Sequence, residues 1–113
     1  MVWEGPRPSD DAAAAESYQQ LVTTLEQGEL APASPAIAKF VAELLRRWPD
    51  ITTEAGEDSP WADGPLIDNA SGPMIYFSMV WSMAEQASAF ATQLADRLQL
   101  VCFDPQLEQL RSA

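Results

Sequence analysis

Residue types that do chemistry are unevenly represented in this chain of 113 residues, which has 17 Asp and Glu, one cysteine and no histidine. The absence of histidine excludes the Ser-His-Asp and Cys-His nucleophile arrangements and all histidine metal sites. A single cysteine excludes an internal disulfide and metal sites built from cysteine clusters. Cys102 lies in the apolar run 100–103, where a thiol is usually a small buried hydrophobe. The composition therefore predicts a protein that is not an enzyme and has no cofactor.

Pairs of carboxylates are the chemistry that remains open. Two carboxyl groups that flank a sugar can hydrolyse a glycoside, but 17 acidic residues offer many pairs and single out none. The stretch 54–58 lacks the alternating acids of an EF-hand loop, which favours a solvated loop over a calcium site. No glycine opens a helix after a strand, so no phosphate-binding loop is expected.

The distribution of charge is more informative than any motif. Six Lys and Arg against 17 acids give a net charge of −11, which disfavours nucleic acids and anionic membranes and favours a basic protein partner or a cation. Residues 48–95 contain no Lys or Arg and seven acids. Acids next to aromatic residues are typical of an electrostatically steered binding face. The alternative is that the acids only hydrate the surface and that Trp61 packs into the core.

The predicted partner-binding residues all come from this base-free stretch. They are Glu57, Asp58, Trp61, Asp63, Asp68 and Trp81. On this interpretation the carboxylates steer a basic partner toward the protein, and the two tryptophans anchor it.

Three helices are predicted from capping residues and apolar spacing. Residues 9–11 provide caps for a helix that ends near Gly28, and Ser34-Pro35 opens a second helix. An apolar stripe at helical spacing extends through residues 37–48 of this second helix. Ser82-Met83-Ala84-Glu85 matches a capping box for a third helix.

The expected strands are short and separated along the chain. They are Val2-Trp3, a hairpin of residues 65–70 and 74–81 around the turn 71–73, and residues 100–103. Residues 50–64 are expected to form an acidic loop, and residues 106–113 a helix fragment or a frayed tail. The predicted fold class is α+β in one domain, residues 1–113. Its small, mostly antiparallel sheet consists of the hairpin plus one or two further strands, covered on one face by about three helices.

Three stretches of the chain resemble a group of small, uncharacterised bacterial proteins. Members of that group end in Leu-Val-Cys-aromatic-Asp-Pro-Gln, similar to Leu100-Val101-Cys102-Phe103-Asp104-Pro105-Gln106. Val2-Trp3-Glu4 and Trp61-Ala62-Asp63-Gly64-Pro65-Leu66 with Gly72-Pro73 are also similar. The group resembles the immunity proteins that neutralise polymorphic bacterial toxins, in which an acidic inhibitor often covers a basic toxin surface. The resemblance implies this function and transfers no catalytic residue.

The leading hypothesis is therefore a cytoplasmic immunity-type protein that binds a basic protein, its cognate toxin. No apolar run approaches the ~20 residues of a membrane span, and the first residues lack a secretory pattern, so no membrane association is expected. The acidic net charge makes nucleic-acid binding equally unexpected. A small ligand-binding domain or enzyme that uses a carboxylate pair is the alternative. A third hypothesis is a structural subunit that self-associates through the edge of the hairpin or its exposed aromatics. The oligomeric state is left open.

Overall fold

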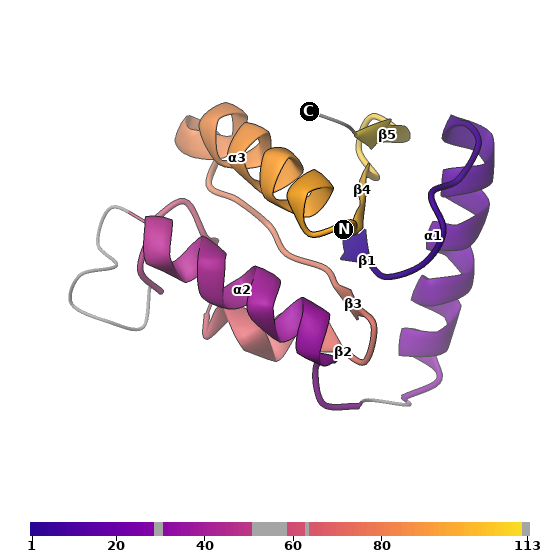
Figure 1. The fold of residues 1–113 in the computed structure, drawn as a ribbon, viewed down its shortest axis with the longest axis horizontal. Coiled ribbons are helices and arrows are strands. Elements are labelled where there is room, and N and C mark those ends of the chain that lie inside the picture. The colour runs from indigo at the N-terminus through magenta and orange to yellow at the C-terminus, as the bar shows by residue number, and fades with distance from the viewer. Residues whose placement is uncertain (29–30, 51–58, 63, 112–113) are drawn as a thin grey trace.

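A computed structural model describes residues 1–28, 31–50, 59–62 and 64–111. Within these residues three helices and a five-stranded antiparallel sheet confirm the α+β class. The helices are α1 (Asp11–Glu26), α2 (Pro35–Arg47) and α3 (Ala84–Arg97). The strands are β1 (Val2–Trp3), β2 (Ala70–Ser71), β3 (Met74–Ile75), β4 (Val101–Asp104) and β5 (Gln109–Arg111). The sheet order is β2-β3-β1-β4-β5 (Figure 1).

The first two helices begin at the predicted capping residues. The carboxylate of Asp10 accepts a hydrogen bond from the Ala13 N–H at 2.8 Å. The hydroxyl of Ser34 accepts one from the Ile37 N–H at 3.3 Å, with proline at the first helical position. Both bonds satisfy N–H groups that a helix leaves without an intrahelical partner.

The start of α3 differs from the prediction. The predicted cap residue, Ser82, lies in the 3₁₀ turn η3 (Trp81–Met83), and α3 begins only at Ala84. The N-cap position is taken by Met83, which makes no side-chain capping bond. The capping box of Ser82 and Glu85 is therefore not formed, because the 3₁₀ turn moves Ser82 out of the cap position.

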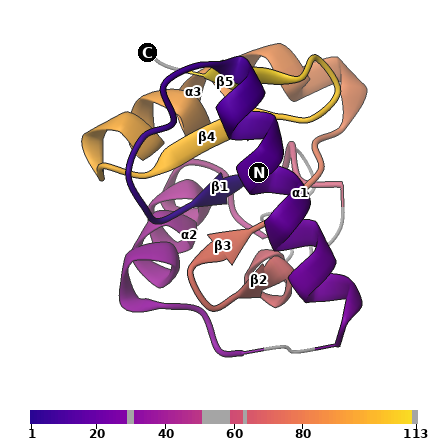
Figure 2. The ribbon, with the colours of Figure 1, turned by 90° about the vertical axis from the view of Figure 1, so that its right-hand side faces the viewer.

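The sheet separates two apolar cores. Val2, Ile75 and Cys102 belong to the core on the side of α2 and α3, whereas Trp3 and Phe103 belong to the core on the side of α1. Figure 2 shows α1 across one face of the sheet, with α2 and α3 behind it. The expectation that the helices cover one face is therefore corrected. Successive strand residues point to opposite faces, and both sets here are apolar, so both faces need a cover.

The hairpin and the C-terminal tail also differ from their predictions. The hairpin strands have two residues each around Gly72-Pro73, and residues 66–69 form the 3₁₀ turn η2 (Leu66–Asn69) instead of a strand. In the tail, Gln109–Arg111 pairs with β4 as an edge strand, instead of forming a helix fragment or fraying. The tail forms a local hairpin with β4 across residues 105–108, although its residues lack the alternation typical of a strand.

Both outer edges of the sheet carry hydrogen bonds to other segments. On the β5 side, the carboxylate of Asp11 accepts a bond from the Leu110 N–H at 2.9 Å. On the β2 side, the Ser34 N–H donates to the Gly72 carbonyl at 2.8 Å. Short edges with occupied backbone groups offer little template for another strand.

We predict that Asp11→Ala loosens β5 from α1. Loss of the carboxylate removes the acceptor for the Leu110 N–H, which should lower the free energy of unfolding by about 1 kcal/mol and accelerate hydrogen exchange at Leu110. Glu16→Ala is the matched control, because Glu16 is an exposed acid on the same helix. Equal exchange rates at Leu110 in both variants would contradict this role for Asp11.

Candidate functional site

A cavity of about 420 Å³ lies between the N-terminal half of α3, the segment 76–79 and the turn from β4 to β5. We call it the α3–β5 groove. Its polar lining consists of Tyr76, Ser78, Glu85, Ser88, Thr92, Cys102, Asp104, Gln106 and Arg111. Its apolar lining consists of Met1, Val2, Phe77, Met79, Ala84, Ala91, Phe103, Pro105 and Leu107. The volume falls within the ~300–1,000 Å³ typical of ligand sites.

The thiol of Cys102 lines this groove. Its sulfur lies 3.8 Å from the Thr92 hydroxyl oxygen, and that hydroxyl donates its hydrogen to the Ser88 carbonyl at 2.7 Å. A hydroxyl has one hydrogen to donate, so the thiol acts as the donor to Thr92. Burial raises the pKa of the Cys102 thiol. Because only the thiolate is a strong nucleophile, this arrangement does not support covalent catalysis.

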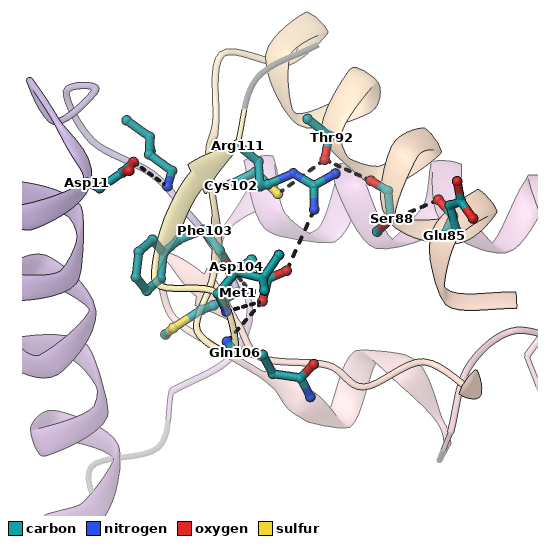
Figure 3. A network of polar contacts seen from close by, with 12 residues as sticks. Met1, Asp11, Glu85, Ser88, Thr92, Cys102, Phe103, Asp104, Gln106 and Arg111 are labelled. Atoms are coloured by element: carbon teal, nitrogen blue, oxygen red, sulfur yellow. Dashed lines mark hydrogen bonds and ion pairs between the residues drawn. The ribbon is translucent and has the colours of Figure 1, made fainter. Parts of the chain in front are cut away.

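Two of the three charged side chains in the groove are paired with each other. One carboxylate oxygen of Asp104 accepts bonds from the N–H groups of Gln106 and Leu107 at 2.9 and 3.3 Å, and the other lies 3.7 Å from the Arg111 guanidinium. Figure 3 shows Arg111 extending from β5 toward α3, with Asp104 below it. Asp104 and Arg111 therefore close the turn and neutralise each other.

The third charged side chain in the lining of the groove is Glu85. It lies in the first turn of α3 and is exposed. No ion pair involves its carboxylate within the part of the chain that the structure describes. A cationic group bound in the groove would find Glu85 available as its counter-ion.

The groove has an exposed apolar lip. Tyr76 is 42% exposed and Leu107 61% exposed, and together with Ile67 they are the exposed large hydrophobic residues of the described chain. Two of these three residues line one cavity, whereas scattered exposed apolar residues are normal and need no explanation. The groove therefore has two of the three exposed large hydrophobic residues of the described chain at its lining.

The wall 76–79 of the groove is also joined to the end of the predicted acidic loop. The Ala62 N–H donates to the Ser78 carbonyl at 3.0 Å, and the Val80 N–H donates to the Pro60 carbonyl at 2.6 Å. Ser78 and Met79 line the groove on the other side of this segment. The groove and the C-terminal end of the acidic segment therefore share one wall.

Trp61 lies in the core and not at the surface. Its side chain is 1% exposed, its indole N–H donates to the Trp48 carbonyl at 3.0 Å, and its ring contacts those of Trp48 and Phe77 edge to face. This is the alternative raised from the sequence, in which Trp61 packs into the core. In this position the ring packs against Phe77, which lines the groove, and is not exposed to a partner.

The other predicted site residues are distributed as follows. Asp68 is exposed on η2, outside the lining of the groove. Trp81 lies in η3, and its side chain falls outside what the structure describes. Glu57, Asp58 and Asp63 lie outside the described residues. Sequence reasoning missed the groove as a site, although Glu85 already stood out as an acid of the base-free stretch.

We predict that alkaline pH destabilises the protein through Cys102. Because burial raises the pKa of this thiol, the folded state keeps its proton above about pH 8.5, where an unfolded chain loses it. This stabilisation is complete below that pH and is lost as the pH rises through the folded-state pKa. In urea unfolding between about pH 8 and 9.5, below the ordinary tyrosine range, Cys102→Ala should show a smaller decline in stability. An identical decline in both proteins would exclude Cys102 as its cause.

The described residues contain no group of three or more Asp, Glu or Cys side chains placed to hold a metal ion. Among the described helices, none is both long and apolar enough to cross a membrane. Comparisons with protein-family models, with curated proteins and with solved structures found no match to this chain.

Proposed function

We propose that this chain is an immunity-type protein that neutralises a bacterial toxin by binding it directly. The observation that carries the proposal is the α3–β5 groove, which is lined by the exposed Tyr76 and Leu107 and by Glu85, whose carboxylate makes no ion pair within the described chain. Such a combination suits a basic protein partner, because aromatic residues supply contact area and the carboxylate supplies charge complementarity.

The net charge of −11 extends this complementarity beyond the groove. The exposed carboxylates of Asp68 and Glu85 both lie in the stretch without Lys or Arg. A field of one sign raises the association rate of an oppositely charged partner by about 10 to 10³-fold and is weakened by salt. Glu57, Asp58 and Asp63 would add to this field from within the same stretch.

The covered sheet edges favour a groove-centred contact over self-association through the hairpin. The hydroxyl of Ser71 in β2 accepts a bond from the Ala31 N–H at 3.1 Å, and the N–H of Gly72, in the turn that follows, donates to the Ala31 carbonyl at 3.2 Å. Because Ala31 is bonded at this end of the hairpin, a second hairpin that approached this edge would have to displace it.

A small-molecule site is the second candidate, because both Glu85 and Asp104 line a cavity of suitable volume. The carboxylate of Asp104 is already engaged by two N–H groups and Arg111. These contacts favour ligand binding over catalysis by a carboxylate pair. A thermal-shift screen with metals and metabolites tests this candidate, since a ligand specific for the folded state raises Tm.

We predict that immobilised protein captures one basic protein from a lysate of the source organism, more strongly at low salt than at moderate salt. Mass spectrometry identifies the captured protein, which is then produced alone and together with this chain. Growth should stop in the first case and recover in the second. A captured protein that leaves growth unchanged, or whose toxicity persists during co-production, would refute the proposed function.

We also predict that Glu57→Gln, Asp58→Asn and Asp68→Asn together lower the association rate with that protein by about tenfold at low salt and flatten its salt dependence. Glu4→Gln, Glu16→Gln and Glu26→Gln form the control, since they remove the same charge from exposed positions outside the base-free stretch. Stopped-flow measurements at several salt concentrations separate local steering from net charge. Equal effects of the two sets would exclude steering by this stretch.

A further inference from the structure

We infer that residues 105–108, which connect β4 and β5, insert the side chain of Leu107 into an apolar recess of a basic partner protein, where a Lys or Arg meets Glu108. This inference rests on the proposed function and specifies the contact by which the partner is held. We call residues 105–108 the β4–β5 loop, since Asp104 and Gln109 pair with each other at its two ends.

The tip of the β4–β5 loop is apolar and exposed. Leu107 is 61% exposed, against 42% for Tyr76 and 39% for Ile67, and these three are the exposed large hydrophobic residues of the described chain. Phe103 and Leu110, in the strands that carry the loop, pack into the core on the side of α1 instead. A single exposed leucine is common in proteins, so the significance of Leu107 depends on how the loop holds it.

The backbone of the loop is restrained at Leu107 itself. One carboxylate oxygen of Asp104 accepts bonds from the N–H groups of Gln106 and Leu107 at 2.9 and 3.3 Å (Figure 3). The ring of Pro105 fixes a backbone dihedral at the start of the loop, and pairing with β4 fixes Gln109 at its end. An apolar side chain on a backbone that is already ordered loses little conformational entropy when it binds.

The two strands below the loop are held against α1. The ring of Phe103 lies 5.3 Å from that of Tyr18, between centroids, and the Leu110 N–H donates to the Asp11 carboxylate at 2.9 Å. These contacts fix the direction in which the loop leaves the sheet. The position of Leu107 is therefore defined before any partner arrives.

Glu108, next to Leu107, has a backbone conformation that favours glycine. Its φ is +51°, in the left-handed region, where a side chain is disfavoured and glycine is not. A loop that only had to connect two strands would be more stable with glycine at this position. Residues held in such conformations are concentrated at binding and catalytic surfaces. The exposed carboxylate of Glu108 is thus presented beside Leu107 at a cost in stability.

The charges around the loop indicate which partner side chain meets Glu108. Glu108 is the one charged residue of the loop, and it makes no ion pair within the described residues. Asp104, at the base, is balanced by the Arg111 guanidinium at 3.7 Å and by the buried ammonium group of Met1. Arg7 donates to the Arg111 carbonyl at 3.5 Å, at the other end of β5. The positive groups therefore lie below the loop, and its tip is negative.

A basic protein with an apolar recess fits this surface. The side chain of Leu107 would lose its contact with water in the recess, which stabilises the complex in proportion to the apolar area buried. A Lys or Arg at the rim would pair with Glu108. An acidic partner would meet the net charge of −11 with like charge.

A pair of glycine variants tests whether the loop is strained as described. Glu108→Gly should melt about 4 °C or more above Gln106→Gly. Gln106 is exposed in the same loop and does not have a positive φ, so both variants gain the same freedom in the unfolded chain and only one relieves strain. Equal melting temperatures would overturn the loop as a strained contact surface.

Binding is tested with the toxin that the growth assay identifies. Leu107→Ser should raise its dissociation rate about tenfold or more, because a buried apolar anchor is lost. Glu108→Gln should weaken binding about threefold, as expected for an exposed charge pair. Both variants should melt as the wild type does, since both side chains are exposed. Ile67→Ser and Glu16→Gln are the matched controls, and effects of the same size in both pairs would overturn the loop as the anchor.

Photo-crosslinking identifies what Leu107 contacts. A photoreactive leucine analogue at position 107 should crosslink to the toxin at an apolar residue that has a Lys or Arg beside it. The same analogue in place of Ile67, the other exposed aliphatic residue, should not crosslink to the toxin. Crosslinks from position 67 alone, or from position 107 to an acidic surface, would overturn the inferred contact.

The inference and the proposed function fail in different ways. If the wild-type chain relieves toxicity and Leu107→Ser with Glu108→Gln relieves it equally well, the proposed function stands and the loop is excluded. If the wild-type chain gives no relief, the proposed function fails and the inferred contact fails with it. Loss of relief in the double variant, with full relief by Ile67→Ser and by Glu16→Gln, supports both.

Discussion

The two-residue strand β1 is the constraint on which the rest of the structure depends. Val2 pairs with Ile75 and Cys102, and Trp3 pairs with Met74 and Val101, so β1 joins the hairpin to the β4–β5 pair. The same two residues enter both cores, because Val2 lies on the side of α2 and α3 and Trp3 on the side of α1. Their side chains are 0% and 4% exposed. Removal of this strand would separate the sheet into two hairpins and leave each core without its central residue.

The α3–β5 groove follows from the same constraint. Met1 and Val2 line it on one side, where the Met1 carbonyl accepts a bond from the Phe103 N–H at 2.9 Å, and the chain after β3 lines it from Tyr76 to Met79. The bridge between Trp61 and Met79 holds this continuation in place from its outer side. The buried Trp61 thus contributes to the groove by fixing its wall, although it does not line the cavity.

Local features of the fold were predictable from the sequence, and features that need distant contacts were not. The starts of α1 and α2 depend on Asp10 and Ser34 and their immediate neighbours, so capping rules located them. The central position of Val2-Trp3 depends on partners far along the chain, and no local pattern encodes it. The strand Gln109–Arg111 pairs with the neighbouring β4, but its residues lack the apolar and polar alternation that indicates a strand. The groove combines residues 1–2, 76–79, 84–92 and 102–111. The sequence therefore indicated only that Leu107 belongs to the C-terminal tail, whereas the structure places it, exposed, in the lining of the cavity.

The chemistry of the groove favours recognition over reaction. Burial raises the pKa of its thiol, one of its two carboxylates is engaged by the turn and by Arg111, and the other is exposed at a helix start. A catalytic site requires a base or nucleophile whose reactivity its neighbours increase, whereas the neighbours of Cys102 and Asp104 restrain them.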